Sequence, residues 1–185
     1  MVAVFDEHPE LFGRFKIELL RGDVVMTPGP ETGHNLIVEA VQDQIPRDRW
    51  RRLQRQDVAI PGEISEPQPD LVVVERGAVP GSGRLMPAQV ISLLVEVVTE
   101  STADRNYGVK RSLYASAGIP AYLIVDPFEA ACLLLTQPGG TGGEADYQQR
   151  LTQDFGDPLP LDVLGIELDT SEFGTLPKFK RHRRP

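Results

Sequence analysis

The strongest constraint on the fold is a nearly continuous apolar run, VISLLVEVV, at Val90–Val98. Such a run is typical of a strand that is covered on both faces, as in the sheet of an α/β protein. A single charged residue, Glu96, interrupts it. An unpaired carboxylate inside a buried strand is costly, so Glu96 requires a hydrogen-bond network, an arginine partner or a metal ion. Glu96 is therefore the first candidate functional residue.

The segments on either side of this strand predict an α/β sandwich. A β-hairpin is expected at Lys16–Leu20 and Val24–Thr27, with Gly22 at its turn. A helix follows, because Leu36, Ile37, Ala40, Val41 and Ile45 recur with helical periodicity before Pro46. The other expected elements are strands at 51–60, 71–74, 121–125 and 131–135, a helix from about Ser101 to Gly118, and a hydrophobic segment at 159–168.

Composition bounds the class of protein. The chain has 185 residues, 41% of them hydrophobic, which suits one domain over residues 1–177. Residues 1–13 are expected to form a loose arm, and residues 178–185 a basic, disordered tail. No apolar run is long enough to span a membrane and the start does not resemble a secretory signal, so we expect a cytoplasmic protein. The single cysteine, Cys132, excludes an intramolecular disulfide and is expected in the core.

Asp70 is the second candidate. It follows Pro69 and opens the apolar strand Leu71–Val74, so its carboxylate is expected where the sheet emerges from a loop. By itself, Asp70 is also compatible with an ordinary turn or strand-start residue. If Asp70 and Glu96 converge at one sheet end, their repulsion would be relieved by a divalent cation. An oxygen-only site suits Mg²⁺, which keeps several waters for a phosphate substrate.

Lys110 is the third candidate. On the helix expected after the Glu96 strand, Tyr107, Lys110 and Tyr114 fall on one face. Lys110 could lean over the sheet end toward the two carboxylates. There it would hold the attacking water or stabilise developing phosphate charge. A solvated helix lysine is the alternative.

With these residues in place, the chain resembles the Uma-two family of restriction-endonuclease-like proteins, in the PD-(D/E)xK nuclease superfamily. The resemblance is carried by the segments KIELLRGDVVMTPGPETGHNLIV, PQPDLVVV, LLVEVVTEST and DRNYGVKRSLYASAGIPAYLIVDP, and it spans residues 15–173. It implies a mixed β-sheet flanked by helices, with an N-terminal β-hairpin. It also implies that acids bind Mg²⁺ or Mn²⁺ and that a lysine assists phosphodiester hydrolysis.

The resemblance implies roles for further residues. Glu18 on the hairpin and His34 at the start of the first helix match recurring family positions. Glu18 could reach the same metal or be an exposed strand residue. His34 could ligate the metal, contact phosphate or cap its helix. The backbone carbonyl of Val97 would complete the metal shell. One position departs from the superfamily pattern: Val98 stands where a lysine is expected, which implies that the lysine has moved to Lys110.

The charges bear on the substrate. The net charge is −8, but residues 178–185 hold five Lys or Arg and no acid, so the rest of the chain carries 14 basic against 27 acidic residues, or −13. Nucleic-acid binding would therefore be weak and sensitive to salt. It would depend on the tail and on the segment RDRWRRLQR, with further contacts from Tyr107 and Tyr114. The arginines of that segment are Arg47, Arg49, Arg51, Arg52 and Arg55. They could equally form a solvated strand edge.

These observations predict a metal-dependent endonuclease that hydrolyses nucleic acid, with DNA favoured over RNA. A homodimer would suit an enzyme that cuts both strands, and symmetric dimers are the commonest oligomers, but the sequence does not establish the oligomeric state. A first alternative is a weak or inactive nuclease-fold module that binds nucleic acid or a protein. A second is a hydrolase of small phosphate esters, which would require a closed pocket.

Overall fold

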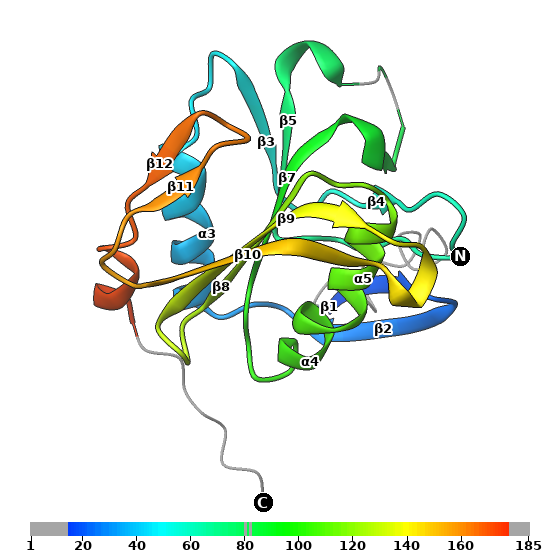
Figure 1. Cartoon of the computed structure of the whole chain (residues 1–185). Coiled ribbons are helices and arrows are strands. Elements are labelled where there is room, and N and C mark those ends of the chain that lie inside the picture. The colour runs from blue at the N-terminus through cyan, green and yellow to red at the C-terminus, as the bar shows by residue number, and fades with distance from the viewer. Residues whose placement is uncertain (1–14, 80, 82, 178–185) are drawn as a thin grey trace, which may run out of the picture.

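The structure is a computed structural model that describes residues 15–79, 81 and 83–177. The predicted arm at residues 1–13 and the predicted tail at residues 178–185 lie outside the described residues. The elements are arranged around a six-stranded mixed sheet (Figure 1). The predicted α/β class, with a mixed sheet and an N-terminal hairpin, is thereby confirmed.

The main sheet contains one parallel pair of strands. In spatial order the strands are β10 (Asp146–Asp154), β9 (Ala131–Gly139), β8 (Ala121–Asp126), β7 (Ile91–Val97), β5 (Leu71–Glu75) and β3 (Trp50–Leu53). All neighbours are antiparallel except β7 and β8. A parallel pair needs a crossover, which is supplied here by helices α4 (Ala103–Tyr107) and α5 (Val109–Ser116).

Each face of the sheet is covered by a different layer. Helix α3 (Thr32–Gln44) and the hairpin of β11 (Leu159–Leu161) and β12 (Ile166–Leu168) cover one face (Figure 1). Helix α5 packs on the other face, beside the hairpin of β1 (Phe15–Leu20) and β2 (Asp23–Pro28). Side chains of β7 alternate between these two cores. The strand is therefore buried on both faces, as its apolar run predicts, and Glu96 faces α5.

Short elements complete the fold. Strands β4 (Val58–Ala59) and β6 (Met86–Pro87) form a small parallel pair. Short 3₁₀ turns occur at Arg76–Ala78, Ala88–Val90, Gly142–Glu144 and Phe173–Thr175.

Two sequence expectations differ from the structure, and one strand was not expected. The helix expected from Ser101 to Gly118 is divided at Gly108, where an added Cβ would lie 2.7 Å from the backbone oxygen of Asp104. The strand expected at 51–60 is divided into β3 and β4, and Arg55 between them adopts a positive φ of 53°. Strand β10 is not predicted, because DYQQRLTQD is an edge strand of mostly exposed polar residues with no clear apolar alternation.

Two further sequence expectations concern membrane spans and Cys132. None of the helices in the described ranges is long and apolar enough to cross a membrane. Cys132 is buried in the core, as expected. Burial raises the pKa of its thiol to about 12, so it is protonated at neutral pH and is a poor nucleophile.

Candidate active site

The register of β5 and β7 brings the first two candidates together. Leu71 pairs with Val95, so Asp70 and Glu96 lie opposite each other one residue further along. Both acids stand at the end of the sheet where β5 begins and β7 ends. The separation of 26 residues in sequence is thus closed by an antiparallel pair of strands, and two carboxylates share one sheet end.

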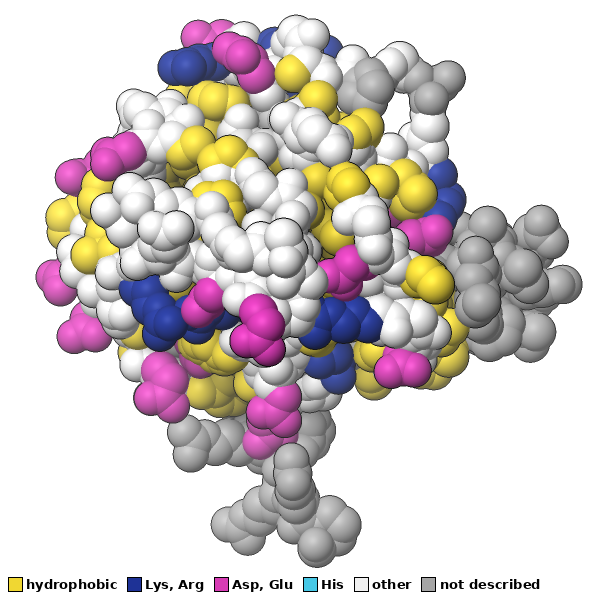
Figure 2. Space-filling model, turned by 45° about the vertical axis from the view of Figure 1, so that its right-hand side comes forward, with side chains coloured by type: hydrophobic (Ala, Val, Ile, Leu, Met, Phe, Trp, Pro, Cys, Tyr) yellow, Lys and Arg dark blue, Asp and Glu magenta, His cyan; other side chains and the backbone are white. Residues whose placement is uncertain are grey.

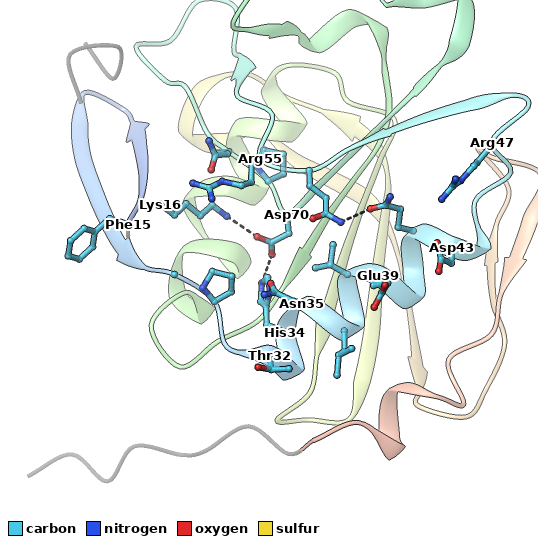
Figure 3. A pocket seen from close by; sticks show the side chains of 18 residues that line it. Phe15, Lys16, Thr32, His34, Asn35, Glu39, Asp43, Arg47, Arg55 and Asp70 are labelled. Carbon is cyan, nitrogen blue, oxygen red and sulfur yellow. Dashed lines mark hydrogen bonds and ion pairs between the residues drawn. The ribbon is translucent and has the colours of Figure 1, made fainter. Parts of the chain in front are cut away.

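One oxygen of Asp70 is held by two donors. The backbone N–H of Val97 donates to Asp70 Oδ2 over 2.9 Å. His34 Nε2 lies 3.0 Å from the same oxygen, where its proton can be donated (Figure 3). The helix α3 positions His34, which is 5% exposed. Asp70 Oδ2 is therefore fixed, and Oδ1 points elsewhere.

One oxygen of Glu96 is held in the same way. Lys110 Nζ lies 2.6 Å from Glu96 Oε1, and the hydroxyl of Tyr114 donates to that oxygen over 3.1 Å. Both donors belong to α5, four residues apart and therefore on one face of the helix. Lys110 also lies 2.7 Å from Glu18 Oε1, which accepts the backbone N–H of Gln68 over 2.8 Å. Glu18, Glu96 and Lys110 are each 1% exposed.

The two remaining carboxylate oxygens face a second lysine. Lys16 Nζ lies 3.0 Å from Asp70 Oδ1 and 3.5 Å from Glu96 Oε2. Lys16 belongs to β1, and its side chain is 16% exposed. A monovalent cation from the protein itself therefore contacts both acids at the end of the sheet.

Burial and neighbouring charges set the pKa values at this site. Burial raises the pKa of Asp70, but Lys16 and His34 outweigh it and hold that pKa well below its usual range. For Glu96, burial prevails over Lys110 and Lys16 and raises the pKa. Burial lowers the pKa of Lys16, but Asp70, Glu18 and Glu96 outweigh it and hold that pKa well above its usual value. Lys16 is therefore a permanent cation at neutral pH.

The donor set fits Mg²⁺ with two protein ligands. Mg²⁺ in enzymes is usually bound through one or two carboxylates and keeps several waters. Asp70 Oδ1 and Glu96 Oε2 supply two such oxygens, since their partner oxygens are already held. No group of three His, Cys, Asp or Glu side chains in the described residues is arranged to hold a metal. Glu18 is directed to Lys110 and Gln68 instead.

The site opens into a groove along α3. The groove has a volume of about 630 Å³, and its lining includes Lys16, His34, Asp70, Arg47 and Arg55. In Figure 3, Arg55 is drawn beside Lys16 and Asp70, and Arg47 lies toward the other end of α3. The same wall carries the acids Glu39 and Asp43. The groove thus connects the carboxylates to two arginines.

A second, smaller cavity adjoins the same residues. It has a volume of about 270 Å³ and shares Lys16, His34 and Asp70 with the groove. Its other walls include Glu96, the 99–102 turn and apolar side chains such as Phe128. Lys16, His34 and Asp70 therefore lie where the two hollows meet.

Most of the other residues that were predicted to contact nucleic acid do not line the groove. Tyr114 is fully buried, and Tyr107 belongs to the separate helix α4 and donates to Asp126 over 2.8 Å. Arg52 donates to the backbone oxygens of Gln42 and Ile45 at the end of α3. Arg49 stacks over Trp50, and Arg51 is exposed on β3. Of the five predicted arginines, Arg47 and Arg55 line the groove.

Lys16 is the residue that sequence reasoning missed. The sequence shows it two residues before Glu18 on an alternating strand, so both side chains are expected on one face. That signal places Lys16 beside Glu18, but it does not say what faces the strand. The contact with Asp70 and Glu96 depends on how the hairpin packs across the sheet end.

Comparison with a solved structure first identifies the type of fold. The fold resembles that of a protein from Anabaena variabilis whose crystal structure is described as "a putative nuclease belonging to DUF820", with a TM-score of 0.66. The two chains are 13% identical over 86% of this chain and 89% of the other, which shows a shared fold. No curated protein matches the chain.

The family follows from the sequence itself. The profile of the Uma2 family, described as "Putative restriction endonuclease", matches residues 5–171. The chain belongs to this family, and the resemblance identified from its sequence is confirmed.

Proposed function

We propose that this protein is a metal-dependent endonuclease that hydrolyses phosphodiester bonds of nucleic acid, with DNA as the favoured substrate and Mg²⁺ or Mn²⁺ as the cofactor. One observation carries the proposal. Asp70 and Glu96 are each held through one oxygen by two donors and direct the other oxygen toward the same cation. Membership of a family described as restriction endonucleases agrees with it.

In this proposal Asp70 and Glu96 hold the divalent cation. The backbone carbonyl of Val97 would join them, because the N–H and C=O groups of one strand residue point to the same side and the N–H of Val97 faces Asp70. When bound, the cation polarises a phosphate oxygen and acidifies water.

The surrounding residues orient these ligands. His34 fixes Asp70, while Lys110 and Tyr114 fix Glu96. Glu18 is the second carboxylate that contacts the Lys110 ammonium, and it also accepts a hydrogen bond from the backbone N–H of Gln68. A direct contact of Lys110 with the attacking water stays a prediction. Its burial favours a positioning role through Glu96.

The groove along α3 is proposed to receive the nucleic-acid backbone. Arg55 would contact a phosphate near the carboxylates, and Arg47 would contact one farther along. A two-fold homodimer would present two such sites to a duplex. Sedimentation velocity with and without DNA tests that arrangement.

Cleavage of supercoiled plasmid DNA tests the proposed function. We expect nicking with Mg²⁺ or Mn²⁺, none with EDTA, and a loss of about 100-fold or more in Asp70→Asn. Circular dichroism checks that the variant is folded. Cleavage that survives EDTA, or that is equal in Asp70→Asn, would remove this site from the reaction.

A binding module without catalysis is the second candidate, and one observation favours it. Lys16 and Lys110 already give both carboxylates a cationic partner within the protein. On this reading, millimolar Mn²⁺ would not bind and plasmid DNA would stay intact, whereas the nuclease reading requires both binding and cleavage.

A further inference from the structure

Two lysines contact the paired acids through different carboxylate oxygens. Lys110 contacts Glu96 Oε1 from α5, whereas Lys16 contacts Glu96 Oε2 and Asp70 Oδ1 from β1. Their surroundings differ as well. Lys110 is 1% exposed and lines neither hollow, whereas Lys16 is 16% exposed and lines both.

We propose that Lys16 is an internal counter-ion of the metal site that becomes a catalytic residue when the metal binds. Without a divalent cation, its ammonium neutralises the oxygens of Asp70 and Glu96 that the metal would use. With the cation bound, the ammonium turns into the adjoining groove and contacts the phosphate of the substrate. This inference rests on the proposed function and deepens it.

The position of Lys16 requires competition with a metal. A cation that binds Asp70 Oδ1 and Glu96 Oε2 must replace an ammonium that lies 3.0 and 3.5 Å from those oxygens. Two cations at this separation repel each other strongly in a partly buried site, because screening by water is weak there. Metal binding therefore drives the ammonium away from the carboxylates.

The structure gives the displaced ammonium a destination. Lys16 lines both the groove of about 630 Å³ and the cavity of about 270 Å³, so its flexible stem has open space on either side. Arg55 lines the same groove. An anionic phosphate in the groove would supply the partner that Lys16 loses.

Lys110 does not suit this role. It holds Glu18 and Glu96 together at 2.7 and 2.6 Å, and both acids are buried. Moving Lys110 to a substrate would leave Glu18 as a buried charge without its cation, which is strongly unfavourable. Lys110 is therefore a positioning residue, and Lys16 is the lysine able to reach the phosphate.

Removal of the Lys16 charge should change metal binding and cleavage in opposite directions. We expect the full-length Lys16→Met variant to bind Mn²⁺ about tenfold more tightly than wild type, since no internal cation competes. With Mn²⁺ saturating, we expect plasmid cleavage to fall about 100-fold or more, because a charge on the phosphate is lost. A residue with a purely structural role would not improve metal affinity.

Thermal unfolding gives a readout that does not depend on cleavage. Lys16→Met should unfold at a lower temperature than wild type without metal, because Asp70 and Glu96 then repel each other. Added Mn²⁺ should raise its midpoint more than that of wild type. Arg150→Met, which removes an exposed charge on β10, is the matched control and should match wild type in metal affinity and cleavage. Lys16→Gln replaces Lys16→Met if the latter does not fold.

The outcomes separate this inference from the proposed function. If wild type binds Mn²⁺ and cuts DNA while Lys16→Met does both equally well, the inference falls and the nuclease stands. If wild type cuts nothing, Mn²⁺ titration still decides: tighter binding by Lys16→Met supports the counter-ion. Equal binding, or none by either protein, overturns it.

Discussion

Asp70 and Glu96 are neighbours, yet their pKa values move in opposite directions. Asp70 borders both hollows and contacts Lys16, His34 and the backbone N–H of Val97, which together favour its charged form. Glu96 is 1% exposed, and the cost of burial prevails over its cationic partners. The same end of the sheet thus holds one carboxyl group whose charged form is favoured and one whose neutral form is favoured.

Tyr114→Phe tests whether the hydrogen bond from Tyr114 to Glu96 Oε1 helps to position the Glu96 carboxylate. The loss of a buried hydrogen bond should lower the free energy of unfolding by about 0.5–1.5 kcal/mol. Metal affinity and plasmid cleavage should also fall, because Glu96 Oε1 keeps only Lys110.

The matched control for that experiment is Tyr122→Phe. Its hydroxyl is equally buried but donates to the backbone oxygen of Asn106. Urea unfolding should show a similar loss of stability, while Mn²⁺ affinity stays at the wild-type value. Equal losses of affinity in both variants would contradict a specific role for Tyr114.

Lys110→Met tests the buried ion pairs. Removing the cation leaves Glu18 and Glu96 buried without it, so we expect a loss of about 3–5 kcal/mol in the free energy of unfolding. Adding Glu18→Gln to this variant should restore part of that loss. Urea unfolding of both proteins measures it. A loss comparable to that of an exposed pair, at most about 1 kcal/mol, would refute the role.

At the scale of elements, the site depends on where α5 lies. This helix carries Lys110 and Tyr114, and it is tied to the edge strand β10 by a two-pronged ion pair. Arg111 Nε and Nη2 lie 2.6 and 2.8 Å from the two carboxylate oxygens of Asp146. A strand that the sequence did not reveal thereby helps to position the helix above Glu96.

Asp146→Asn tests that connection and its dependence on pH. Burial raises the pKa of Asp146, but Arg111 outweighs it and lowers the pKa overall. The folded state therefore favours the charged carboxylate. Its stabilisation is complete above the unfolded pKa of about 3.9 and is lost as the pH falls below it.

We expect Asp146→Asn to lower the free energy of unfolding at pH 7 by about 0.5–1 kcal/mol, since the side chain is partly exposed. The difference from wild type should shrink below about pH 4. Urea unfolding at pH 7 and at pH 3.5 measures both, with Asp154→Asn on the same strand as the control. A difference that is the same at both pH values would rule out the charged pair as its cause.

At the scale of the whole molecule, the net charge and its distribution bear on the proposed binding of nucleic acid. The net charge is −8, and on the face shown in Figure 2 acidic and basic side chains are interspersed without a broad basic surface among the described residues. In the proposed function, contacts with phosphate would come from Arg47, Arg55 and Lys16, which line the groove.

Arg55→Met should weaken DNA binding and reduce its dependence on salt. The plot of log K against log salt has a negative slope, and each phosphate contact that is lost reduces the magnitude of that slope by about 1. Fluorescence anisotropy with labelled DNA and EDTA, over a series of salt concentrations, measures the slope. Arg150→Met should leave it unchanged. An unchanged slope in Arg55→Met would show that Arg55 does not contact phosphate and would contradict its proposed role.

Much of the fold could be predicted from the sequence. The run at 90–98 predicts a strand with two buried faces, and the glycine and proline residues mark the hairpin and helix ends. Asp70 and Glu96 were identified as a pair from their positions in apolar strands. Strand β10 escaped detection because an exposed edge strand needs no apolar pattern.

The sequence by itself determined which residues must be explained, because a charge within a buried strand is costly wherever that strand lies. Only the tertiary structure decided which lysine side chain contacts which carboxylate oxygen. Lys16 lies 54 residues from Asp70 and 80 from Glu96 in the sequence, and Lys110 contacts the other oxygen of Glu96. Ion pairs depend on distances of a few ångströms between side chains, and those distances are set by the packing of the hairpin and α5 against the sheet.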